Sequence, residues 1–227
     1  VAVKSFLHFY DKVKVVIHED GSLSEADLSR IQDHLPGARL ISRKKANSAL
    51  LTVLPEDIAR ARAEHVLLMK VIDFNYFSTA DKIILLDSDI VFTGKPDEAI
   101  DWLESDINQT FYNPDPLKNT FRANNVPEGV VLPDNFNSGF LGYFGVIRLE
   151  NIISAIRTID YFLEDQTVYA FLLASSKTQA LDPKRYFIFE GGAIPSNAKM
   201  VHFISPNRFT GHVYIRLAKK ICKQFLS

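Results

Sequence analysis

The fold is indicated most clearly by one segment, Asp81-Lys82-Ile83-Ile84-Leu85-Leu86-Asp87-Ser88-Asp89-Ile90-Val91-Phe92. Its apolar run, residues 83–86, is uninterrupted, which is typical of a strand covered on both faces. In an extended chain, residues two apart point to the same side, so we expect Asp87 and Asp89 to project together while Ser88 faces away. The carboxyl end of a strand is also where open α/β sheets bind ligands.

The pair Asp87 and Asp89 predicts a divalent cation. Two carboxylates this close repel each other, and holding them at the end of an apolar strand is costly unless a cation neutralises them. Oxygen ligands suit Mg²⁺ or Mn²⁺, which proteins often share with substrate phosphates. The alternative, from these residues alone, is a polar turn that ends the strand, because Asp-x-Asp is a common sequence.

Upstream of this segment, strand and helix patterns alternate. The predicted strands cover residues 13–17 and 39–42, and the predicted helices begin at Ser24 and after Pro55. Ser24 and Asp27 have the spacing of a weak capping box, and residues 66–77 are apolar enough to be buried. Strands separated by helices form right-handed βαβ units. We therefore expect an α/β fold with a mostly parallel central sheet flanked by helices.

Downstream of Val91 the pattern changes. Residues 113–135 are rich in Asn, Pro and Asp, which predicts a long loop of functional importance. A strand is predicted over residues 143–149, and helices over residues 151–162 and 166–175.

The last helix, residues 217–225, is amphipathic and basic. Its expected apolar face consists of Leu217, Ala218, Ile221, Cys222 and Phe225, and the basic residues lie elsewhere. Such a helix packs on the core with a solvated basic face, or lies on a membrane surface as a peripheral contact.

Composition sets outer limits on the function. With 227 residues, 47% of them hydrophobic, we expect a single domain over residues 1–227. The net charge of -1 predicts no nucleic-acid partner. Cys222 is the sole cysteine, which excludes an internal disulfide and favours a reducing, cytoplasmic location. No sequence stretch has the length of a membrane span or the pattern of a signal peptide. Because the chain begins at Val1 and enters an apolar segment directly, we expect its start to be missing.

Residues 81–92 resemble the Asp-x-Asp segment of GT-A glycosyltransferases, most of all family 8, the glycogenin-like enzymes. Four further elements resemble that family in the same order. They are Lys70 in the preceding helix, Asn137-Ser138-Gly139, Asp165-Gln166, and His202 in Met200-Val201-His202-Phe203. Two features differ from the family. Its first strand is expected before Val1, and its Gly and Lys-Pro-Trp sequence is replaced here by Ser205-Pro206-Asn207-Arg208.

The resemblance implies a Rossmann-like nucleotide-sugar-binding domain and a role for each of these residues. Asp87, Asp89 and His202 would hold Mn²⁺ or Mg²⁺, with the imidazole favouring Mn²⁺. The donor diphosphate would be contacted by the segment Asp87-Ser88-Asp89, by Lys70 and by Arg208. Lys70, Asn137 and Asp165 would form the catalytic set around the transferred sugar. The donor would be a UDP-sugar, the acceptor a hydroxyl of a glycan, lipid or protein, and the reaction would retain the anomeric configuration.

Each of these residues also has a plain structural interpretation. His202 lies in an apolar stretch, where a histidine usually makes one hydrogen bond and nothing else. Lys70 fits a lysine extending along a helix edge. Asn137 belongs to a turn-forming tripeptide. Asp165 fits a cap of the helix that begins near Gln166, and Glu164 is its fallback.

Two other functions compete with glycosyl transfer. Haloacid-dehalogenase-like phosphatases also place Asp-x-Asp after an apolar strand, with the first Asp as nucleophile. Their motif usually opens the domain, whereas more than 80 residues precede it here. The other alternative is a non-catalytic module that binds a nucleotide-sugar without turnover.

Overall fold

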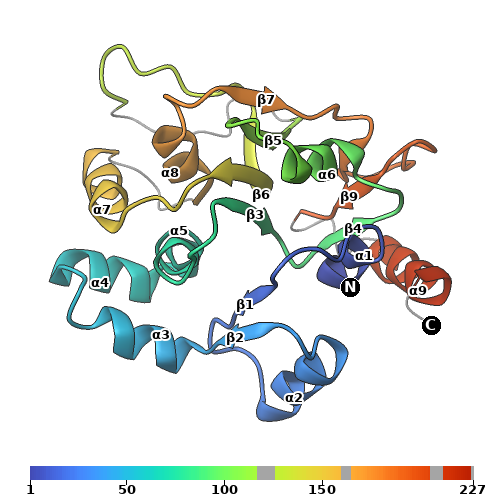
Figure 1. Ribbon diagram of the computed structural model, residues 1–227, viewed down its shortest axis with the longest axis horizontal. Helices are drawn as coiled ribbons and strands as arrows, with labels where there is room; N and C mark the ends of the chain where they lie inside the picture. Colours follow the sequence, from blue (N-terminus) through green and yellow to red (C-terminus); the bar gives the residue numbers. More distant parts are fainter. Residues whose placement is uncertain (117–125, 160–164, 205–211, 226–227) are drawn as a thin grey trace.

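The structure is a computed structural model that describes residues 1–116, 126–159, 165–204 and 212–225. Helices cover mixed sheets in an α/β arrangement (Figure 1). The helices are α1 (Ala2–Leu7), α2 (Glu25–His34), α3 (Arg43–Leu50), α4 (Glu56–Glu64), α5 (Val66–Tyr76), α6 (Asp97–Glu104), α7 (Leu149–Thr158), α8 (Asp165–Leu172) and α9 (Val213–Phe225). The strands are β1 (Val16–His18), β2 (Arg39–Ile41), β3 (Lys82–Leu86), β4 (Ile90–Phe92), β5 (Thr110–Pro114), β6 (Phe136–Phe144), β7 (Thr178–Ala180), β8 (Tyr186–Ile188) and β9 (Met200–His202).

The sheets are mixed, which corrects the expectation of a mostly parallel sheet. A parallel pair β1-β2 stands beside a four-stranded sheet in the order β3-β6-β5-β7 and a three-stranded sheet in the order β4-β9-β8. Strand β6 runs antiparallel to both of its neighbours, and β4 runs antiparallel to β9. The sequence pattern failed here because antiparallel neighbours need no crossover helix, and none of the described residues between β5 and β6 is helical.

Upstream, α2, β2 and α4 lie where the sequence predicts them and β1 overlaps its predicted strand, whereas α1 and α3 were not predicted. Ser24 caps α2 in the predicted capping box: its hydroxyl accepts the backbone N–H of Asp27, and the Asp27 carboxylate accepts the backbone N–H of Ser24. Strand β3 forms as expected but is less covered than its apolar sequence predicts, since Leu85 alone among its residues is buried. The reason is its place at one edge of the described four-stranded sheet.

Strand β6 corrects the prediction of a strand over residues 143–149. It spans Phe136–Phe144, Gly145 then turns with a φ of 78°, and α7 begins at Leu149. The turn-forming character of Asn137-Ser138-Gly139 hid the first half of this strand from sequence reasoning. The hydrophobic residues on either side of the tripeptide bury the whole segment up to Tyr143.

A register shift in β6 bends the strand at that tripeptide. Tyr112 of β5 pairs with Leu141, but the next residue, Asn113, pairs with Asn137. Residues 138–140 therefore have no partner on β5 and follow β3 instead, where Leu86 pairs with Phe140. Bulges of this kind re-aim side chains at the ends of sheets, and here the bulge lies beside Asp87.

The core divides around the sheets. The largest cluster joins α3, α4, α5, α7 and α8 to one face of the four-stranded sheet, a second lies under α1 and α6, and a third under α9. Helix α9 packs through Ile221, which is buried, while Lys219 and Lys220 are exposed. The two ends of the described chain lie at the same end of the molecule, where α1 contacts α9 (Figure 1). Among the described residues, no helix has the length and apolar character that crossing a membrane requires.

Candidate active site

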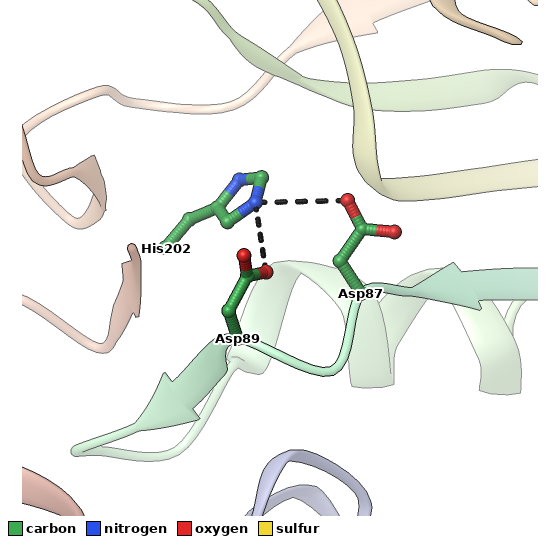
Figure 2. A group of neighbouring side chains, drawn as sticks. All are labelled: Asp87, Asp89 and His202. Atoms are coloured by element: carbon green, nitrogen blue, oxygen red, sulfur yellow. Dashed lines mark ion pairs between the residues drawn. The ribbon is translucent and has the colours of Figure 1, made fainter. Parts of the chain in front are cut away.

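The segment Asp87-Ser88-Asp89 lies where the chain passes from one sheet to another. Strand β3 ends at Leu86 in the four-stranded sheet, and β4 begins at Ile90 in the three-stranded sheet. The connection turns rather than staying extended, which corrects the expected geometry. Ser88 is exposed, as predicted, and the two carboxylates still converge (Figure 2).

His202 completes this group from the last residue of β9. Its neighbour across the sheet is Ile90, so pairing with β4 brings the imidazole next to the Asp-x-Asp turn. The Nε2 atom lies 3.3 Å from Oδ1 of Asp89 and 3.6 Å from Oδ2 of Asp87 (Figure 2). One candidate ligand atom from each of the three residues falls within 4.8 Å of the others. The side chain of His202 is 3% exposed.

Lys70 joins this group to a second carboxylate on α8. Its ammonium lies 2.7 Å from Oδ1 of Asp87 and 2.8 Å from Oδ2 of Asp165. The Lys70 side chain is only 12% exposed. The hydroxyl of Ser138 donates to the same Asp165 oxygen at 2.6 Å and lies 3.3 Å from the ammonium. The bulge in β6 thus delivers Ser138 to a point where α5, α8 and the Asp-x-Asp turn meet.

The charge of Lys70 is fixed by these carboxylates. Burial by itself lowers the pKa of the ammonium, but the nearby charges of Asp165 and Asp87 outweigh burial and raise the pKa above its ordinary value. The lysine is therefore a permanent cation at neutral pH. Its backbone is also held, because the phenol of Tyr169 donates to the Lys70 carbonyl at 2.9 Å.

Asn137 lies at the start of the bulge and uses both ends of its amide. Its Nδ2 donates to Oε1 of Gln166 at 3.2 Å, and its Oδ1 accepts the backbone N–H of Gly139 at 2.9 Å. Gln166 follows Asp165 on α8, so this single turn of helix contacts both Asn137 and Lys70. Asn137 lies in a strand and not in the turn that its tripeptide suggested.

The structure thus brings together six of the residues expected at the site: Lys70, Asp87, Asp89, Asn137, Asp165 and His202. Arg208 and the fallback carboxylate Glu164 lie outside the described residues. Sequence reasoning assigned no role to Ser138 or Gln166, although both belong to the motifs quoted above. Their position inside short polar motifs beside Asn137 and Asp165 was the available signal.

The residues present suit a divalent cation. Two carboxylates and one imidazole form a hard-to-intermediate donor set, which fits Mn²⁺ and tolerates Mg²⁺. The Nδ1 atom of His202 is buried and has no hydrogen-bond partner among the described residues, and the opposite ring nitrogen faces the carboxylates. Within the part of the chain that the structure describes, the ammonium of Lys70 is shared between two carboxylates, so this group favours additional positive charge.

Comparison with known proteins supports the fold. No model of a known protein family matches the chain, and no curated protein sequence matches it significantly. Among solved structures, mouse xyloside xylosyltransferase 1 is similar over 91% of both chains, with 12% identity and a TM-score of 0.52. The glycosyltransferase GlyE of Streptococcus pneumoniae TIGR4 matches 99% of this chain at 17% identity, with a TM-score of 0.56. The bifunctional glycosyltransferase WbbM matches all of it at 17% identity, with a TM-score of 0.58.

The fold is that of these glycosyltransferases. The chain spans 59% of the length of GlyE and 49% of the length of WbbM. The expected α/β architecture of the GT-A type is therefore confirmed, with the mixed sheet described above. The narrower resemblance to family 8 stays a prediction.

Proposed function

We propose that this protein is a metal-dependent glycosyltransferase that moves a sugar from a nucleoside-diphosphate donor, preferably a UDP-sugar, to an acceptor hydroxyl. The observation that carries the proposal is the convergence of Asp87, Asp89 and His202 at one edge, on a fold shared with solved glycosyltransferases. The acceptor hydroxyl would belong to a glycan, a lipid or a protein.

The site residues divide the work as follows. Asp87, Asp89 and His202 would hold Mn²⁺ or Mg²⁺, which when bound stabilises, as a Lewis acid, the negative charge that develops on the departing diphosphate. Lys70 supplies a fixed positive charge next to Asp87, where the same diphosphate oxygens would lie. Its pairing with two carboxylates keeps the ammonium in place before the donor arrives.

The sugar end of the donor would meet Asn137 and Asp165. Both side chains are buried, and both are already oriented by hydrogen bonds to Gln166, Gly139 and Ser138. Amide and carboxylate groups held in this way suit sugar hydroxyls, and fixed orientation reduces the entropy lost on binding. We propose retention of the anomeric configuration on the strength of the sequence resemblance alone.

The test is a thermal-shift screen of nucleoside diphosphates and nucleotide sugars, with and without Mn²⁺, followed by transfer assays with the donor that binds. Ligands that bind the native state raise the unfolding midpoint by mass action. We expect the largest shift with a uridine diphosphate and Mn²⁺ together. Stabilisation by guanosine or cytidine diphosphates alone would contradict the donor assignment. Metal-dependent binding without transfer or hydrolysis would identify a binding module, and hydrolysis of a generic phosphate ester would identify a phosphatase.

A further inference from the structure

Gly139 is the point at which three separate groups of the site meet. Its carbonyl accepts the backbone N–H of Asp87 at 2.8 Å. Its own N–H donates to Oδ1 of Asn137 at 2.9 Å. Its α-carbon faces the imidazole of His202, because a β-carbon added there would lie 2.2 Å from Cε1 and 2.8 Å from Nδ1 of that ring.

The need for glycine at this position is a need for space. Gly139 does not adopt the left-handed conformation that Gly145, with a φ of 78°, requires. Its backbone is that of a bulged strand, which any residue can adopt, and the side chain is excluded by contacts alone. Glycine inside a strand often marks the close approach of another group, and here that group is a buried imidazole.

We propose that Gly139 is the positioning residue that sets the separation between His202 and the Asp-x-Asp turn. Its two backbone hydrogen bonds fix Asp87 and Asn137 relative to β6. Because its α-carbon carries no side chain, the His202 ring can pack directly against the same strand. A residue with a side chain would push the imidazole away from Asp87 and Asp89, by more than a metal site tolerates. The consequence for metal binding rests on the proposed function, whereas the steric coupling between Gly139 and His202 does not.

The chain provides a matched control on the same strand. A β-carbon added at Gly142 would lie 2.1 Å from Cε1 of Phe111, a clash as severe as the one at Gly139. Phe111 belongs to the hydrophobic cluster under α1 and α6, which contains none of the proposed metal ligands. Gly139→Ala and Gly142→Ala therefore insert the same methyl group against two different ring systems, one in the candidate site and one in the core.

The experiment is a double-mutant cycle with two measurements, urea unfolding of the metal-free proteins and Mn²⁺ titration of the folded ones. Gly139→Ala and Gly142→Ala should both lower the urea midpoint. Gly139→Ala should also weaken Mn²⁺ binding by about 10- to 100-fold, the usual effect of disturbing groups that orient metal ligands, whereas Gly142→Ala should leave the affinity unchanged.

Adding His202→Ala should restore most of the urea midpoint lost in Gly139→Ala, because the ring at 2.2 Å is removed and only the 2.9 Å contact with Oδ1 of Asn137 remains, but it should not restore that of Gly142→Ala. The proposal is overturned if the double variant Gly139→Ala/His202→Ala is no more stable than Gly139→Ala, or if both of these variants are unfolded. It is also overturned if Gly139→Ala binds Mn²⁺ like the wild type. If the wild type binds no Mn²⁺ while the rescue is seen, the proposed function fails and the steric coupling stands.

Discussion

Helix α5 carries two buried charged groups one turn apart, and the fold surrounds them differently. The carboxylate of Asp73 is fully buried and accepts two hydrogen bonds from Arg62, each of 2.6 Å. The remaining guanidinium nitrogen of Arg62 donates to Asn47 at 2.8 Å. Lys70, three residues before Asp73, is instead shared between Asp87 and Asp165. One cluster pairs one cation with one carboxylate, and the other divides one cation between two.

This difference separates a structural ion pair from a candidate binding site. In the Arg62–Asp73 pair the two charges balance, and each of the three guanidinium nitrogens donates a hydrogen bond. A further ion would therefore find no unmatched charge in this pair. At Lys70, counting the described residues only, two carboxylates share one ammonium, and His202 adds an imidazole beside Asp87. Carboxylates held this close together repel each other unless a bound cation completes the cluster. Burial of charge alone therefore does not mark a binding site, whereas the unequal number of carboxylates and cations in this cluster points to one.

The largest effect should come from breaking the matched pair. Arg62→Met leaves the buried Asp73 without its partner, and we expect a loss of about 3–5 kcal/mol in the free energy of unfolding. Urea unfolding measures this loss. The folded fraction should bind Mn²⁺ with wild-type affinity, because Arg62 has no part in the metal group. A changed affinity would mean that the two clusters are not separate.

Removing the charge of Lys70 should change Mn²⁺ affinity, which the Arg62 variant leaves unchanged. Lys70→Met removes the positive charge beside Asp87 and Asp165, so Mn²⁺ alone should bind about tenfold more tightly or better, which corresponds to about 1.4 kcal/mol or more. UDP binding in the presence of Mn²⁺ should weaken, since a phosphate contact is lost. Calorimetry of Mn²⁺ binding and of UDP binding measures both changes in affinity. The control is Lys95→Met, which removes a charge from an exposed lysine. Weaker binding of Mn²⁺ alone would contradict the role assigned to Lys70.

The smallest effect should come from an ion pair on the surface. Arg157 on α7 makes two hydrogen bonds of 2.9 Å to Asp57 on α4, a geometry as regular as that of the buried pair, but both side chains are about half exposed. Arg157→Met should therefore lower the free energy of unfolding much less than Arg62→Met does, because water screens the exposed pair, and urea unfolding of the two variants measures the difference. A loss equal to that of Arg62→Met would show that the shared geometry, and not burial, determines how much each pair contributes to stability.

Sequence reasoning found the parts of the site that lie in continuous patterns. Asp87 and Asp89 were predicted because an apolar run precedes them, and the capping box at Ser24 because both of its partners are three residues apart. These are local features, and local chemistry determines them.

The rest depends on packing between distant segments. The pairing of Lys70 with Asp165 requires α5 and α8 to be neighbours, and no spacing in the sequence encodes that. The direction of β6 and the bulge at Asn137 depend on which strands it joins. For the same reason the role of Gly139 is visible only once His202 lies against it.

The central claim is that Asp87, Asp89 and His202 hold a cation on which donor binding depends. The most direct measurement is calorimetry of UDP binding, with and without Mn²⁺, to the wild type, Asp89→Asn and the exposed control Asp101→Asn. Asp89→Asn keeps the shape of the side chain and removes its charge. It should abolish Mn²⁺-dependent UDP binding while the protein stays folded, and Asp101→Asn should match the wild type. If Asp89→Asn binds UDP with unchanged affinity and unchanged dependence on Mn²⁺, the proposed metal site does not exist.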